Sequence, residues 1–358
     1  MRLEFEGYAA AHKEMLAKAV DIVGKWITGL KDPELGDVGE AFTEHFAETE
    51  CRQEIDPRET YLRAGYTSFR YKKGEEGFIN RILYGMKAES DLDALFSARV
   101  HESTHAMQKK ASVALHGSYA NPRTRILICP EDWIMLQERC EQDAFTKQAW
   151  FCSLLADDLK EIVSSSSGEP ISVPDFLALR KKYGNLPETL VGAARAYMDK
   201  RFYTDDGDYD DYKFANAVHD SVLSGYNFAM DVRRKRGESF TFVRLGPKDR
   251  EAAVRAIGGS FGPNSFGEGR ILPEFLEGPH LRQTPNKLVD SKSAQTRLDE
   301  LNKKLGITDY NALPELSDVL AERGMTLESF IADSYENPSP VLTGGSQPSS
   351  ALNELTPR

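Results

Sequence analysis

The stretch His101-Glu102-Ser103-Thr104-His105 lies within residues 89–115, a segment that contains neither glycine nor proline. Because these two residue types are the strongest helix breakers, the segment predicts one long helix. Residues four positions apart lie one turn apart on the same helix face, so the imidazoles of His101 and His105 can reach a single ion. The rest of the chain is interpreted around this helix.

The spacing of these residues matches H-E-x-x-H, a pattern in which two histidines bind zinc and the glutamate acts as a general base. Zinc lowers the pKa of a bound water, and a carboxylate beside it can take the proton and return it to a leaving amine. We therefore expect a zinc site at His101 and His105, with Glu102 as the base in peptide hydrolysis. The alternative is two surface histidines that bind nothing, and the helical context disfavours it.

A third zinc ligand must come from outside the motif, because a catalytic zinc usually has three protein ligands and a water. The metzincin pattern would place a glycine and a third histidine shortly after the motif, but residues 106–111 read AMQKKA. A carboxylate from the next predicted helix, residues 131–160, is the expected source.

That helix offers two glutamates at different positions of its wheel, drawn at about 100° per residue. Glu141 projects into the middle of the apolar face, Glu138 lies at its edge, and Asp143 points toward the polar border. A buried carboxylate is costly unless it is paired or holds a metal. Glu141 is therefore the expected ligand and Glu138 the second choice, with a buried ion pair as the alternative for Glu141. Gln137 and Gln148 project nearby, either as donors that orient the ligands or as ordinary polar residues.

Two residues of a further predicted helix, 210–236, could donate a hydrogen bond to the developing oxyanion. His219 and Tyr226 lie two turns apart on a similar face of that helix. Packing or a surface position is the favoured alternative for each.

The remaining chain predicts many helices and few strands. Further helices are expected over 7–30, 38–50, 173–183, 186–202 and 294–333, and short strands over 124–129 and 239–243. Residues 61–71 fit a strand or a buried connection equally. The glycine-rich residues 257–270 predict a connector, with a mobile flap as the alternative. Together these elements predict a mainly α (α+β) fold.

Composition and charge indicate which kinds of binding partner the chain is expected to have. The chain has 358 residues and a net charge of −11, which disfavours binding to nucleic acid or to anionic membranes. Residues 1–6 lack the basic and apolar regions of a secretory signal, and no apolar stretch approaches the roughly 20 residues of a membrane helix. We therefore expect a cytoplasmic protein whose partner is a peptide or protein substrate, with export without a cleaved signal left open.

Three segments carry a resemblance to known proteins: Ala98–Gln108, Cys129–Trp133 and Glu138–Ala144. An H-E-x-x-H helix, a short strand and a helix with a carboxylate ligand resemble the gluzincin group of zincin metallopeptidases. More closely, residues 60–230 look like a bacterial domain family described only as candidate metallopeptidases. The resemblance implies a zincin-like catalytic core with a small sheet, flanked by helical segments. It also implies zinc, held by the motif histidines, with the motif glutamate as base.

The chain departs from the gluzincin pattern at one point. That group usually places an aspartate four residues after the ligand glutamate, whereas here Gln142 follows Glu138 and Phe145 follows Glu141 at that distance. The identity of the third ligand stays open between the two glutamates.

We expect four regions along the chain. These are an N-terminal helical segment (1–60), the catalytic domain (61–236), a C-terminal helical region (237–335) and a disordered tail (336–358) rich in Ser, Pro, Gly and Thr. The expected function is zinc-dependent peptide hydrolysis. The alternative is a non-catalytic or effector-type interaction protein that retains a structural or degenerate metal site.

Overall fold

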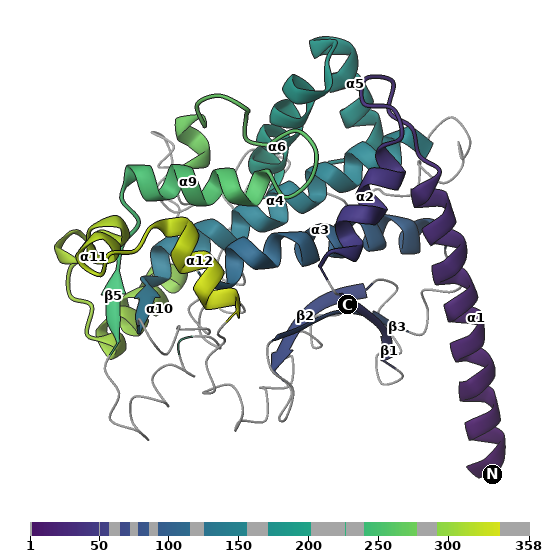
Figure 1. Ribbon diagram of the computed structural model, residues 1–358, viewed down its shortest axis with the longest axis horizontal. Coiled ribbons are helices and arrows are strands. Elements are labelled where there is room, and N and C mark those ends of the chain that lie inside the picture. Colours follow the sequence, from purple (N-terminus) through teal and green to yellow (C-terminus); the bar gives the residue numbers. More distant parts are fainter. Residues whose placement is uncertain are drawn as a thin grey trace.

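A computed structural model describes most of the chain with gaps. The described residues are 2–49, 51–56, 65–71, 78–85, 92–114, 125–155, 171–201, 226, 240–277 and 292–336. Within them the protein is mainly helical with two small sheets (Figure 1), which confirms the predicted mainly α (α+β) class. The predicted site residue His219, and the predicted tail apart from Glu336, lie outside the described residues.

Two long helices, α3 (Leu92–Ala114) and α4 (Pro130–Leu155), pack side by side in the middle of the molecule (Figure 1). Helix α4 begins at Pro130, whose missing N–H costs nothing at the first helical position. Glu131 and Asp132 follow in the first turn, where acidic side chains suit the positive end of the helix dipole. The H-E-x-x-H motif is therefore in the predicted helical setting.

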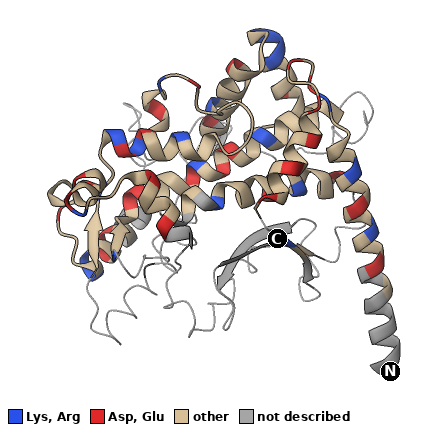
Figure 2. Ribbon diagram, viewed as in Figure 1, with Lys and Arg blue, Asp and Glu red and all other residues tan. Residues whose placement is uncertain are grey.

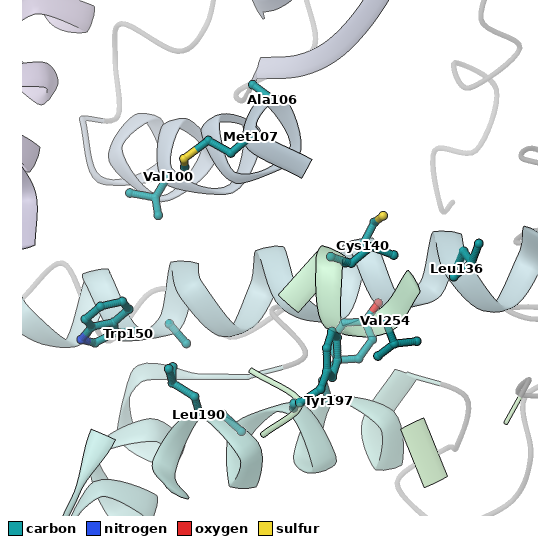
Figure 3. Close-up of a cluster of buried hydrophobic side chains, with 14 of the residues drawn as sticks. Val100, Ala106, Met107, Leu136, Cys140, Trp150, Leu190, Tyr197 and Val254 are labelled. Atoms are coloured by element: carbon teal, nitrogen blue, oxygen red, sulfur yellow. The ribbon is translucent and has the colours of Figure 1, made fainter. Parts of the chain in front are cut away.

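The other described helices surround this pair. They are α1 (Arg2–Thr28), α2 (Val38–Ala47), α5 (Val173–Tyr183), α6 (Leu186–Arg201), α9 (Pro247–Gly258), α10 (Lys292–Leu305), α11 (Leu316–Glu322) and α12 (Leu327–Glu336). Helices α5, α6 and α9 pack against α4, while α1, α2 and α12 pack against α3. In Figure 3, α4 lies between Val100 and Met107 of α3 and Leu190 and Tyr197 of α6. Most of the 26 residues of α4 are buried as a result.

Two small sheets complete the described fold. Strands β1 (Arg52–Asp56), β2 (Gly65–Tyr71) and β3 (Phe78–Gly85) form a sheet of order β1-β3-β2, parallel between β1 and β3 and antiparallel between β2 and β3. This sheet packs against α3 on the side away from α4 (Figure 1). Strands β4 (Ile126–Ile128) and β5 (Thr241–Val243) pair in parallel.

One hydrophobic core joins segments that are far apart in the sequence. Its buried members run from Leu16 on α1, through Val100 on α3 and Trp150 on α4, to Phe330 on α12. The expected N-terminal, catalytic and C-terminal regions thus all contribute side chains to it. Lys and Arg positions are interspersed with Asp and Glu positions along the described helices (Figure 2). No described helix has both the length and the apolar character needed to cross a membrane.

Two buried aspartates fix α4 near its ends. Asp132, in the first turn, accepts hydrogen bonds from Arg250 (2.7 Å), from the Tyr310 hydroxyl (3.0 Å) and from the Leu245 backbone N–H (2.7 Å). Near the other end, the indole N–H of Trp150 donates to Asp32 at 2.8 Å. A buried carboxylate is costly to leave unpaired, so these contacts are expected to persist. They fix the position of α4 near both of its ends, and therefore also the position of the α4 residues that face α3.

Candidate metal centre

Three side chains from the central helices converge on one point. The Nε2 atoms of His101 and His105 on α3 lie 3.0 Å apart. Each is 3.4 Å from an oxygen of Glu141 on α4, the first from Oε2 and the second from Oε1. We call these three residues the metal-ligating group, and they are the one group of at least three such side chains found among the described residues. Sequence reasoning named all three.

The donors fit zinc in their chemistry, because zinc binds imidazole nitrogens and carboxylate oxygens. The two 3.4 Å distances end on different oxygens of Glu141, so the carboxylate presents one oxygen to each imidazole. One donor atom from each of the three residues lies within 4.8 Å of the other two. The three side chains are therefore close enough together to hold one ion.

The group is partly accessible to solvent. The side chains of His101, His105 and Glu141 are 12%, 15% and 38% exposed. Solvent therefore reaches the group mainly at the Glu141 carboxylate. The exposure also corrects the helical wheel, which put Glu141 in the middle of a buried apolar face.

Glu138 is not a member of the metal-ligating group. It is buried, with 5% of its surface exposed, although the wheel placed it at the edge of the apolar face. Asp143, expected at a polar border, is fully buried. The discrepancies at Glu138 and Asp143 have one cause: α4 is covered by α3, α5, α6 and α9, so it has no single apolar face for a wheel to find.

The ring of His101 is held by a glutamine and an aromatic side chain, both from α4. Its Nδ1 lies 3.0 Å from Oε1 of Gln148, whose amide nitrogen donates to the Ser97 hydroxyl at 2.6 Å. The ring also meets Phe145 edge-on, with centroids 4.5 Å apart. An amide oxygen at Nδ1 favours a proton there and leaves Nε2 free for a metal. Gln148 thus has the orienting position that was one of its two sequence interpretations.

The ring of His105 is held by a different glutamine, Gln108, one turn further along α3. Its Nδ1 lies 2.9 Å from Oε1 of Gln108, and the Gln108 amide nitrogen donates to Asp143 at 2.8 Å. Sequence reasoning missed this role for Gln108. The signal was available, because residues three apart on a helix share a face.

Without a metal, the Glu141 carboxylate and the His105 imidazole stabilise each other as charged groups. Partial removal from water opposes ionisation of Glu141, but contacts with His105 and His101 outweigh it and hold the pKa of that carboxyl well below its usual range. Burial likewise opposes protonation of His105, but Glu141, Glu102 and the bond to Gln108 raise the pKa of this imidazole to about 9. The proton on His105 therefore competes with a metal for the same nitrogen.

A histidine titration of the metal-free protein should show this raised pKa directly. Labelled at the imidazole carbons and followed by NMR, His105 should titrate with a midpoint near pH 9. Since its unfolded pKa is about 6.5, the charge contributes stability that is fully present below that pH and is lost as the pH rises through about 9. Zinc affinity should rise over the same interval.

The matched variant is Glu141→Gln, which keeps the shape and removes the charge. Its His105 midpoint should fall well below that of the unchanged protein, with His105→Gln used to assign the signal. A midpoint near pH 6.5 in the unchanged protein would contradict the described geometry.

Glu102, the expected base, is half-buried on α3 between the motif histidines in sequence. The negative charge of Glu102 is one of the causes that raise the pKa of His105. The Glu102 carboxylate is therefore close enough to act electrostatically on the metal-ligating group. The geometry is thus compatible with the role that the motif predicts.

Tyr226, one of two expected oxyanion donors, is engaged elsewhere. It is fully buried against Trp133 near the start of α4, with ring centroids 5.4 Å apart, and its hydroxyl donates to the Ile128 carbonyl. Trp133 precedes Glu141 by eight residues, or about 12 Å along a helix. Tyr226 therefore has the packing role that was its alternative interpretation, and His219 lies outside the described residues.

Comparisons of the chain with models of protein families, with curated proteins and with solved structures found no match.

Proposed function

We propose that this protein is a zinc-dependent peptidase with His101, His105 and Glu141 as its metal ligands. The observation that carries the proposal is the convergence of these three donors, one atom from each within 4.8 Å of the others, at a point that solvent partly reaches. The proposal includes the zincin-like character that the sequence resemblance implies. The order of motif helix, short strand and glutamate-bearing helix supports it.

The number of donors and their partial exposure favour a catalytic metal site over a structural one. Structural zinc sites are closed by four protein ligands, whereas catalytic sites have three and keep a position for water or substrate. Among the described side chains the group contains three donors, and the Glu141 carboxylate is 38% exposed. This arrangement favours hydrolysis over the alternative of an interaction protein with a structural metal.

The chain's own residues have distinct parts in such a reaction. Bound zinc supplies a Lewis acid that polarises a carbonyl and makes water a better nucleophile. Glu102 accepts the proton of the attacking water and passes it to the leaving amine. Gln148 and Gln108 hold the two imidazoles with Nε2 directed at Glu141. Glu141, with 38% of its side chain exposed, is the donor that solvent reaches most.

Metal content and peptide hydrolysis, measured on the same preparation, test the proposal. Protein purified without chelator should carry about one zinc per chain and should cleave members of a mixed fluorogenic peptide library. 1,10-Phenanthroline should abolish cleavage, and added zinc should restore it. Zinc-loaded protein that cleaves no peptide would refute the peptidase proposal, and protein that takes up no zinc would refute the metal site as well.

A further inference from the structure

The hydrogen bonds behind His105 fix the direction of an amide. Gln108 is almost completely buried, with 1% of its surface exposed. Its amide nitrogen donates to Oδ2 of Asp143 at 2.8 Å and to the Cys140 carbonyl at 3.1 Å. The Cys140 carbonyl can only accept, and Oδ2 of Asp143 also accepts from the Ser260 hydroxyl, so the amide nitrogen must face them and the amide oxygen must face His105.

This direction determines where His105 carries its proton. An oxygen 2.9 Å from Nδ1 accepts a hydrogen bond only if Nδ1 is protonated. The neutral ring then has its lone pair on Nε2, the atom that points at Glu141 and His101. A reversed amide would favour the opposite tautomer, which cannot bind a metal through Nε2.

Asp143 is itself held by a segment more than a hundred residues downstream. The hydroxyl of Ser265 donates to Oδ1 at 2.6 Å and that of Ser260 to Oδ2 at 3.2 Å. Lys147, fully buried, lies 3.9 Å from Oδ1 and donates to the Pro263 carbonyl at 2.6 Å. We call residues 259–267 the Asp143 loop. The two serine hydroxyls of this loop donate a hydrogen bond to each oxygen of the Asp143 carboxylate, which has no exposed surface.

The support behind His101 is less restrictive. The amide of Gln148 donates to the hydroxyl of Ser97, and a hydroxyl can either donate or accept. A reversed Gln148 amide could therefore still be satisfied. The hydrogen bonds around Gln108 permit one amide direction and therefore one tautomer of neutral His105. The hydrogen bonds around Gln148 do not restrict the tautomer of His101 in this way.

We propose that Gln108 and Asp143 are positioning residues that fix His105 in the tautomer and orientation that binds the metal. The Asp143 loop completes the arrangement by holding Asp143. This inference rests on the proposed function, because it assigns the residues that prepare the same site. Neither residue is expected to touch the metal or the substrate.

Zinc affinity of two matched glutamine variants tests the proposal. Gln108→Leu removes the acceptor at His105, whereas Gln142→Leu removes an equally buried glutamine of α4 that bonds to Arg139 and to the Ala194 carbonyl. Measured by competition with a fluorescent zinc chelator, Gln108→Leu should bind zinc about 10–100-fold more weakly than the unchanged protein. Gln142→Leu should lose stability but bind zinc almost as tightly.

A double variant that exchanges the amide of Gln108 and the carboxylate of Asp143 tests whether zinc binding can be restored. Gln108→Glu alone places a carboxylate against Asp143 and should weaken zinc binding. In Gln108→Glu with Asp143→Asn, the amide donates to the new carboxylate, whose other oxygen again accepts from Nδ1 of His105. The new carboxylate still faces the Cys140 carbonyl, so the double variant should recover part of the zinc affinity that Gln108→Glu alone loses, even if it unfolds at a lower temperature. If Gln108→Leu does not fold, this comparison decides the question.

The outcomes separate this inference from the proposed function. If the unchanged protein binds zinc and Gln108→Leu binds it equally well, or if the double variant is no better than Gln108→Glu alone, the positioning role is refuted and the zinc site stands. If the unchanged protein binds no zinc, both proposals fail.

Discussion

Replacing Glu102 by glutamine should lower peptide hydrolysis by about 10²–10⁴-fold, the range typical of losing a general base, and leave zinc in place. The substitution keeps the shape of the side chain and removes its ability to take a proton. The metal ligands are separate residues, so the metal content should stay at the level of the unchanged protein. Hydrolysis of the responsive library peptide and zinc content by atomic absorption would be measured on one preparation.

A surface exchange of the same kind serves as the control. Glu300 on α10 is exposed, and Glu300→Gln should change neither activity nor zinc content. If Glu102→Gln hydrolyses peptides as fast as Glu300→Gln, then Glu102 is not the base. Loss of zinc from Glu102→Gln would instead mean that this glutamate holds the metal site together.

Replacing Glu141 by alanine should lower zinc affinity by more than the roughly 10–100-fold that loss of an outer partner costs. The reason is direct, because one of three donor atoms disappears and the two imidazoles lose the carboxylate that lies 3.4 Å from each. Titration with zinc in a competing chelator measures the change, and peptide hydrolysis should fall with it at limiting zinc.

Glu138→Ala is the matched variant for this prediction. It removes the same group from the same helix, three residues earlier, at a position outside the metal-ligating group. Because Glu138 is buried, the variant is expected to unfold at a lower temperature and to bind zinc like the unchanged protein. The reverse result, with zinc lost from Glu138→Ala and kept by Glu141→Ala, would overturn the choice of third ligand.

The local features of the site were predictable from the sequence because they depend on a few neighbouring residues. The segment 89–115 forms α3 (Leu92–Ala114), since nothing in it breaks a helix. Residues 173–183 form α5 with the expected bounds, with Ser172 as a capping residue and Gly184 in a left-handed conformation at its end. The choice of Glu141 agrees with the geometry, although the wheel led to it through a burial that the structure does not have.

The tertiary features were not predictable in this way. Strands β1 and β3 belong to a sheet whose pairing joins residues 29 positions apart, such as Arg52 and Arg81. Their periodicity alone does not distinguish them from other short segments. The predicted polar border of α4 is covered, so Asp143 became a buried hydrogen-bond acceptor. The serines that reach it, Ser260 and Ser265, lie in a glycine-rich segment with no motif.

The position of the Asp143 loop determines how far a fragment of the chain must extend to keep the support of the site. A fragment that stopped at Arg201 would contain the three candidate donors and the proposed base. It would nevertheless leave Asp143 without its two hydroxyl partners and the Lys147 side chain without the Pro263 carbonyl. Shortening the chain to the region around the H-E-x-x-H motif would thus remove part of the support behind His105. The shortest expressible version that keeps this support must extend past residue 267.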